Sequence, residues 1–447
     1  MSRAQFATRL GVIATTVGSA VGLGNIWRFP YETGVHGGAA FLLLDLFFIF
    51  IIGVPVVCAE FIIGRHTGSN IRGAFRMLAP RQAWGWVSYI GITASVLILS
   101  FYSVVAGWTM HYTVKSVAGF SDNTSTEALH AQFDSFASGN ILPMLWTLAF
   151  LAINYLILSR GVQKGIERMS NILMPILFAI LLLFTVNSLM MPGAKEGLMF
   201  LFSPDFSAIT PSVVLGAMGQ AFFSLSLGLG CLITYSSYFK SDTPLLRTAL
   251  ITAGLDTFVA ILAGMIIFPA VFTFGQQPEA GPKLVFEVLP SIFADMAGGV
   301  VWSTLFFLLL FLASLTSTIS MAEITIAYLC EEFRMTRRGA TALSIGVAMI
   351  LGSLCALSFG VLGDMKVFGL TLFNLFDYTS SNILLPIGGM IISLFVGWKL
   401  DRSVVISELS AGGGRATKFA TRIVIFCLRW LAPVCIAMVF IFGLNIF

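Results

Sequence analysis

The stretch Gly18-Ser19-Ala20-Val21-Gly22-Leu23-Gly24-Asn25 lies inside the first apolar segment of the chain, and the related stretch Phe222-Phe223-Ser224-Leu225-Ser226-Leu227-Gly228-Leu229-Gly230 lies inside the sixth. Glycine in a helix interior costs about 0.8–1.0 kcal/mol relative to alanine, so a cluster of glycines beside small polar residues favours a break. Close packing of two helices through small residues also explains one such cluster. Two clusters that share Gly-Leu-Gly, five apolar segments apart, favour two functional breaks.

The composition excludes an ordinary soluble protein. Of the 447 residues, 57% are hydrophobic and only 10% are charged, whereas a soluble domain carries about 25% charged residues. The excess apolar surface must therefore face lipid. A membrane-spanning helix needs about 20 apolar residues. We expect an all-α membrane protein with eleven spans, at residues 10–31, 39–64, 87–117, 142–158, 172–191, 211–238, 248–275, 300–329, 340–359, 370–398 and 423–447.

The basic residues are concentrated in every second connecting segment, which places most of them on one side of the membrane. If the N-terminus is cytoplasmic, the other side of the membrane holds only Arg28, Lys115, Lys195, Lys283 and Lys366. Basic residues concentrate on the cytoplasmic side of membrane proteins. We therefore expect a multi-pass protein of the plasma or inner membrane, with its N-terminus in the cytoplasm and its C-terminus outside. The first apolar run lacks a small-residue cleavage site, so we expect no cleaved signal peptide.

The positions of the two breaks suggest an internal repeat. Spans one to five and six to ten form two units of five, and an odd number of spans turns the second unit upside down. We expect the first inverted repeat at residues 1–192 and the second at residues 193–402. A cytoplasmic loop and the eleventh span would then occupy residues 403–447.

Broken helices expose backbone groups in the middle of a membrane. The N-terminal end of a half-helix attracts a carboxylate, and the C-terminal end attracts an ammonium group or a metal cation. Two breaks that face each other can therefore hold both ends of a zwitterion together with sodium. An α-amino acid suits this arrangement best.

Three motifs resemble those of one family. The sequences GSAVGLGNIWRFP at residues 18–30, QAFFSLSLGLGCLITY at 220–235 and ASLTSTI at 313–319 resemble the first, sixth and eighth helices of the neurotransmitter:sodium symporters. The resemblance runs over residues 3–398. It implies alternating access, five-plus-five inverted repeats and discontinuous helices 1 and 6. The function it implies is sodium-coupled symport of neutral, hydrophobic L-amino acids, with no covalent chemistry.

The resemblance also assigns site residues. Oxygen atoms are the ligands that a hard cation prefers. Sodium site 1 would use Ala20, Asn25, Ser224 and Asp256 with the substrate carboxylate, and sodium site 2 would use Gly18, Val21, Ala313, Thr316 and Ser317. The substrate would contact Ala20, Leu23, Gly24, Ile98, Tyr102, Phe223, Ser224, Ser226, Leu229, Ser317 and Met321. Arg28 with Asp377 resembles the external gate, and Arg3 with Glu331 resembles the cytoplasmic one. Without the motif, Thr316 and Ser317 would be read as hydroxyls bonded to their own helix.

Some positions depart from the family pattern or leave two readings open. Asp256 stands where the family usually has asparagine, Asp45 aligns near a chloride-binding tyrosine of animal members, and Ala260 replaces a chloride-binding serine. We hypothesise that chloride is not required, because the aspartates supply the negative charge. Alternatively, Asp45 lies near a helix end and reaches the interface. Gly165 and Pro175 match a pattern at which the fifth helix unwinds, although a simple kink also explains them.

Other functional classes fit the sequence less well. His36, His66, His111 and His130 are scattered, without the His-Glu-x-x-His motif of a zinc protease, and Asp45 with Asp256 lacks a catalytic motif. The six cysteines have no paired spacing. A channel would need a pore-lining filter. A transporter of another small zwitterion or amine, and a non-transporting amino-acid sensor, remain as alternatives. We expect lipid, sodium and substrate as partners, without nucleic acid or a required oligomer.

Overall fold

The computed structural model describes residues 4–119, 126–275, 285–286, 289–296, 298–410 and 415–444. In this part of the chain the architecture is helical, apart from one isolated bridge between Val367 and Leu370. The longer α-helices, in chain order, are α1 (Arg9–Ala20), α2 (Phe29–Val35), α3 (Ala39–Phe48), α4 (Val54–Thr67), α5 (Ile71–Leu78), α6 (Val87–Ala118), α7 (Thr126–Ala137), α8 (Ile141–Leu158), α9 (Arg168–Leu189), α10 (Ala194–Phe202), α11 (Pro211–Ser224), α12 (Cys231–Ser236), α13 (Leu245–Thr273), α14 (Leu289–Asp295), α15 (Gly299–Glu332), α16 (Arg337–Leu357), α17 (Leu372–Tyr378), α18 (Leu385–Leu394), α19 (Arg402–Ser410), α20 (Arg415–Phe426) and α21 (Ala432–Gly443).

Among the described residues, nine helices are long and apolar enough to cross a membrane. One further span, the first in the chain, consists of α1 and the helical segment Gly24–Val35, which are bent by 52° at the first glycine cluster. The expected span at residues 211–238 does not qualify as one helix, because α11 has 14 residues, α12 has 6 and residues 225–230 between them are not helical. The two predicted discontinuities are thus confirmed, and they explain why fewer than eleven uninterrupted spans are found.

The second break is held open by backbone conformation. Ser226, Gly228 and Gly230 have φ angles of +52°, +82° and +79°. Glycine adopts this left-handed region without steric cost, whereas an L residue such as serine does so at a cost of about 1–2 kcal/mol. The glycines of the Gly-Leu-Gly sequence therefore favour the non-helical conformation of residues 225–230 that separates α11 from α12.

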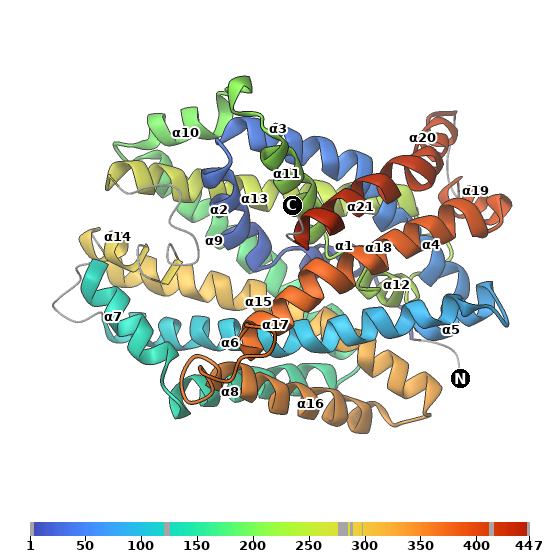
Figure 1. The fold of residues 1–447 in the computed structure, drawn as a ribbon, viewed down its shortest axis with the longest axis horizontal. Coiled ribbons are helices and arrows are strands. Elements are labelled where there is room, and N and C mark those ends of the chain that lie inside the picture. Colours follow the sequence, from blue (N-terminus) through green and yellow to red (C-terminus); the bar gives the residue numbers. More distant parts are fainter. Residues whose placement is uncertain are drawn as a thin grey trace.

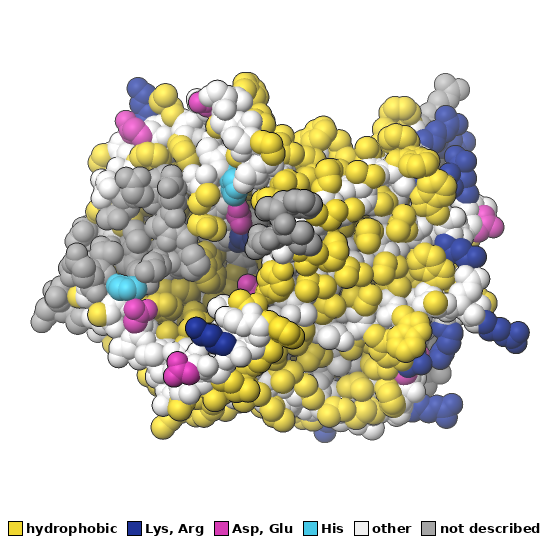
Figure 2. Space-filling view, in the orientation of Figure 1, with side chains coloured by type: hydrophobic (Ala, Val, Ile, Leu, Met, Phe, Trp, Pro, Cys, Tyr) yellow, Lys and Arg dark blue, Asp and Glu magenta, His cyan; other side chains and the backbone are white. Residues whose placement is uncertain are grey.

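The spans run roughly along the long axis of the molecule, so their connecting segments gather at its two ends. Figure 1 shows α5, α19 and α20 at the end where the N-terminus lies, and α7, α10 and α14 at the opposite end. Figure 2 shows Lys and Arg side chains clustered at the first of these ends, beside a broad hydrophobic band. This separation agrees with the charge distribution that predicted the cytoplasmic side.

The helix boundaries differ from the expected spans by a few residues, with one larger exception. The fifth span begins at Val162 rather than near residue 172, because a π-helical turn, η4 (Val162–Glu167), precedes α9 without interruption. The long spans α6 and α15 pack against each other, and α1 packs against α9, α13 and α15. The first break therefore lies in the centre of the bundle.

Candidate binding site at the two helix breaks

The first break turns backbone amides toward the centre of the protein. α1 ends at Ala20, and a π-helical turn, η1 (Gly24–Arg28), resumes the helix. Between them, the Gly22 N–H donates to Asn25 Oδ1 (3.0 Å) and the Leu23 N–H donates to the Tyr102 hydroxyl (2.9 Å). Tyr102 of α6 thus lies beside the amides, as the family resemblance implied.

Three of the residues predicted for sodium site 1 meet through their side chains. The Asn25 amide donates to Asp256 Oδ1 (2.8 Å) and to Ser224 Oγ (3.1 Å), and Ser224 Oγ donates to Asp256 Oδ2 (2.6 Å). All three are buried. The cluster joins the first break, the second break and α13. It gathers hard oxygen donors around one carboxylate, which is the chemistry that a sodium ion requires.

The residues predicted for sodium site 2 lie where α1 meets α15. Ser317 Oγ donates to the Val21 carbonyl (3.0 Å), and a Cβ built on Gly18 would lie 3.4 Å from Thr316 Cβ. The Thr316 hydroxyl bonds to the Ala313 carbonyl (3.0 Å) of its own helix, which is the alternative reading of that residue. Across the described residues, no three His, Cys, Asp or Glu side chains are grouped to hold a metal. A cation here would depend on carbonyl and hydroxyl oxygens.

A small cavity of about 40 Å³ lies between the two breaks. Its lining contains no charged residue and joins α1, η1, α6, α11, the second break, α15 and α18. The lining residues are Ala20, Gly22, Gly24, Ile98, Phe101, Tyr102, Phe223, Ser224, Ser226, Leu229, Ser317, Met321 and Leu385. Ten of the residues predicted to contact substrate are among them. Leu23 instead lines a larger outer cavity. Gly22, Phe101 and Leu385 were not predicted.

The larger cavity, of about 650 Å³, leads from the small one toward the end that carries α7. Figure 2 shows the molecular face hollowed near its middle, with acidic and basic side chains at the hollow. Arg28 and Asp377, the predicted external gate, both line this cavity. In the described part of the chain they do not form an ion pair, because Arg28 bonds to Glu32 (3.4 Å) and lies over the Phe223 ring at 4.3 Å. The predicted gate pair therefore does not close this cavity.

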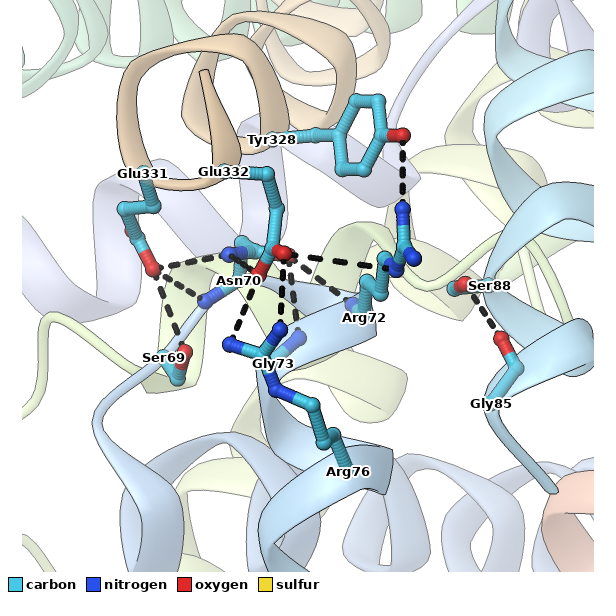
Figure 3. A network of polar contacts seen from close by, with 10 residues as sticks. All are labelled: Ser69, Asn70, Arg72, Gly73, Arg76, Gly85, Ser88, Tyr328, Glu331 and Glu332. Atoms are coloured by element: carbon cyan, nitrogen blue, oxygen red, sulfur yellow. Dashed lines mark hydrogen bonds and ion pairs between the residues drawn. The ribbon is translucent and has the colours of Figure 1, made fainter. Parts of the chain in front are cut away.

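The opposite end is closed by polar contacts between α5 and the end of α15. Of the predicted cytoplasmic gate, Arg3 lies outside the described residues. Glu331 accepts hydrogen bonds from Ser69 Oγ (3.1 Å) and from the Asn70 backbone N–H (2.8 Å), and Glu332 pairs with Arg76 (3.1 Å). Figure 3 shows these side chains converging between the two helices.

A second closing contact was not predicted. Arg337 forms a two-pronged ion pair with the buried Glu323, and the Tyr238 hydroxyl donates to the same carboxylate (2.6 Å). Phe6 packs edge-on against Tyr238, with ring centroids 5.7 Å apart. Glu323 could have been identified from the sequence, because a carboxylate inside an apolar span needs a partner.

The beginning of the fifth span binds the beginning of the first. Glu167, the last residue of η4, accepts hydrogen bonds from the Ala7 N–H (2.8 Å), the Thr8 N–H (3.0 Å) and the Thr8 hydroxyl (3.0 Å). A Cβ built on Gly11 would lie 2.0 Å from Glu167 Oε1, so a larger residue there would displace the Glu167 side chain. Gly165 lies in this π-helical turn and Pro175 inside α9. π-Turns are frequent at functional sites.

Two further buried carboxylates lie near the breaks. Asp45 of α3 is 2% exposed, and its Oδ1 has no hydrogen-bond partner among the described residues. Its burial does not fit the alternative in which it reaches the membrane interface. Glu60 of α4 is fully buried and accepts a hydrogen bond from the Gly228 N–H (2.9 Å). Glu60 therefore supports the second break, a role that the glycine motif alone did not indicate.

The sequence and the fold were compared with those of known proteins, and both comparisons identify similar membrane transporters. The model of the sodium:neurotransmitter symporter family matches residues 3–124 and 125–447. The crystal structure of MhsT in complex with L-phenylalanine is similar over 98% of this chain and 99% of that one, with 45% identity and a TM-score of 0.90. An uncharacterized sodium-dependent transporter of Bacillus subtilis is 40% identical over 98% of this chain and 97% of its own length.

A more distant relative is the sodium-dependent serotonin transporter of Drosophila melanogaster, which is 26% identical over 99% of this chain and 76% of its own length. The fold, the two broken helices and the sodium dependence of the relatives all agree with the resemblance seen in the sequence motifs. The chain belongs to the sodium:neurotransmitter symporter family, and is a sodium-dependent membrane transporter rather than an enzyme.

Proposed function

We propose that this protein carries neutral, hydrophobic L-amino acids into the cell by symport with sodium, through alternating access. The observation that supports the substrate class is the small cavity between the two breaks. It is lined mostly by apolar side chains and by no charged residue, and backbone amides border it at the first break. A charged side chain would be buried there without a partner, which is costly.

The two ends of the substrate have separate partners in this proposal. The carboxylate lies against the Leu23 and Gly24 amides and the Tyr102 hydroxyl, and the ammonium group meets carbonyls near Ala20, Phe223 and Ser226. Ser226 Oγ lies 3.4 Å from the Ser19 carbonyl, so the polar edges of the two breaks are close together. The phenylalanine bound to MhsT supports an amino-acid substrate.

Two sodium ions accompany the substrate. Site 1 uses Ala20, Asn25, Ser224 and Asp256 with the substrate carboxylate, so that ion and substrate bind cooperatively. Site 2 uses Gly18, Val21, Ala313, Thr316 and Ser317, and the unwinding of η4 and α9 between Gly165 and Pro175 gives water access to it. The contact between Ser317 Oγ and the Val21 carbonyl supports this position.

Chloride is not required in this proposal. Asp256 supplies a negative charge within the site 1 cluster, and the buried Asp45 supplies a second acidic group nearby, where Ala260 offers no hydroxyl. The N-terminus lies in the cytoplasm and the C-terminus outside, and one chain suffices for transport. The inverted repeats occupy residues 1–192 and 193–402.

The decisive experiment is uptake of labelled amino acids into proteoliposomes with and without an inward sodium gradient. We expect sodium-dependent uptake of at least one hydrophobic amino acid, and competition by others. Uptake of an amine or another zwitterion alone would replace the proposed substrate. Sodium-dependent binding without uptake would identify a sensor, and the absence of both would refute the proposal.

A further inference from the structure

The binding pocket is backed by the tenth span through direct contact between backbones, and we propose that this span determines which side-chain sizes the pocket accepts. The specificity-determining residues are Leu385 and Gly388 of α18. The ligands concerned are neutral amino acids, and the proposal is that the pocket discriminates among them by the volume of the side chain. This inference deepens the proposed function and rests on it.

The empty pocket is too small for a bulky side chain. A water molecule needs about 10–15 Å³ of such a cavity, so the volume of about 40 Å³ holds roughly three waters. A larger side chain fits only if it extends into the adjoining larger cavity or if a wall of the small one moves. The walls from α6 and α15 belong to long helices that pack against each other. Residues 225–230 are not helical, so this segment is the wall that can adapt.

Helix α18 packs against residues 225–230 on the side away from the pocket, and this contact limits how far the segment can move away from a ligand. A Cβ built on Gly228 would lie 2.3 Å from the Leu385 carbonyl oxygen and 2.5 Å from the Gly389 nitrogen. A Cβ built on Gly388 would lie 2.3 Å from the Gly228 carbonyl oxygen. The backbones of the second break and of α18 therefore touch, without room for a single methyl group. The segment cannot move toward α18 unless α18 moves as well.

Gly228 is also held from another helix, because its N–H donates to Glu60 Oε1. The residues on either side of it in the segment, Ser226 and Leu229, line the pocket. A displacement of Gly228 is thus transmitted to both of these walls. Pushing Gly228 away from α18 carries them toward the ligand.

Leu385 acts on the pocket directly. Its side chain is 3% exposed and lines the same cavity. It lies three residues before Gly388, so both face the same side of α18. The π-helical turn η7 (Thr379–Leu384) ends immediately before it and shifts the register of the tenth span at this level. One face of α18 therefore both supports the movable wall and closes the pocket.

The test measures selectivity of the full-length protein in sodium. A labelled amino acid that binds the wild type is displaced by alanine, valine, leucine, phenylalanine and tryptophan, and the ratio of affinities between large and small ligands is recorded. Each methylene in an apolar pocket changes discrimination by about 10–200-fold. We expect Leu385→Ala to raise the tryptophan-to-valine ratio by about tenfold or more, and Gly388→Ala to lower it by about tenfold.

Matched variants control for loss of packing. Leu394→Ala removes the same atoms from the same helix, at a position that does not line the cavity. Gly346→Ala adds a methyl group to α16 with nothing within 4 Å of it. Both should keep the wild-type ratio.

The ratio separates selectivity from damage, because partial misfolding lowers the apparent affinity of every ligand by the same factor. The inference is overturned if Leu385→Ala leaves the ratio within roughly threefold of the wild type, or if Leu394→Ala shifts it equally. If Gly388→Ala does not fold, Leu385→Ala alone decides. A wild type that binds no amino acid in sodium would refute the proposed function, and this inference with it.

Discussion

Replacing Glu60 with alanine should weaken substrate binding although Glu60 does not line the pocket. Its carboxylate is the acceptor for the buried Gly228 N–H at 2.9 Å. Leaving a buried donor unpaired costs about 1–3 kcal/mol. If that cost falls on the ordered form of the second break, the population able to bind decreases, and the apparent Kd rises by up to about 5- to 150-fold.

The measurement is equilibrium binding of labelled substrate in saturating sodium, with thermal unfolding recorded in parallel. Glu60→Gln keeps an oxygen that can accept the same hydrogen bond, so it should recover most of the affinity. Cys58→Ala, also fully buried on α4, controls for lost packing. Wild-type affinity in Glu60→Ala, or equal losses in the alanine and glutamine variants, would refute the reasoning.

Three further predictions follow from the geometry. Ser224→Ala should weaken sodium and substrate binding together, because its hydroxyl belongs to the site 1 cluster and linkage is reciprocal; full sodium affinity in the presence of substrate would contradict a shared site. Replacing chloride with gluconate should leave the initial uptake rate unchanged, since Asp256 supplies the charge; a rate that follows the chloride concentration would show otherwise. A hydrogen bond with Glu32 raises the pKa of His36 above its ordinary value, so the resulting stabilisation is present at low pH and is lost as the pH rises through the raised pKa. The melting temperature of the wild type should therefore exceed that of His36→Gln by more at about pH 6 than at about pH 8, and an equal difference at both would disprove this.

The sequence alone predicted the breaks and most of the pocket. A glycine cluster weakens a helix locally, wherever its neighbours lie, so the first break and Gly228 could be found without knowledge of packing. Tyr102 and Met321 came from the register of family motifs, and both line the cavity. Their roles in binding stay predictions.

Residues that act through packing were harder to find. Leu385 lies in an apolar run with nothing to distinguish it, and only the contact between α18 and the second break gives it a role. Arg28 pairs with Glu32 rather than with Asp377, and all three residues line the larger cavity; a sequence motif does not decide between two acidic neighbours. Glu60, in contrast, carried a signal, since a carboxylate inside a span is costly without a partner.

The three hydrogen bonds that Glu167 accepts have a mechanical consequence. They tie the two residues that precede α1 to the last residue of η4, so the two segments form a latch at the N-terminal end of the first span. Hydrogen bonds to a carboxylate contribute about 1.5–3 kcal/mol each, so opening the latch must be offset by contacts formed elsewhere in the transport cycle. Any tilt of α1 away from the bundle must either release this latch or pull η4 out of its helical winding. The inner end of the first span and the start of the fifth therefore cannot move independently of each other while the latch is closed.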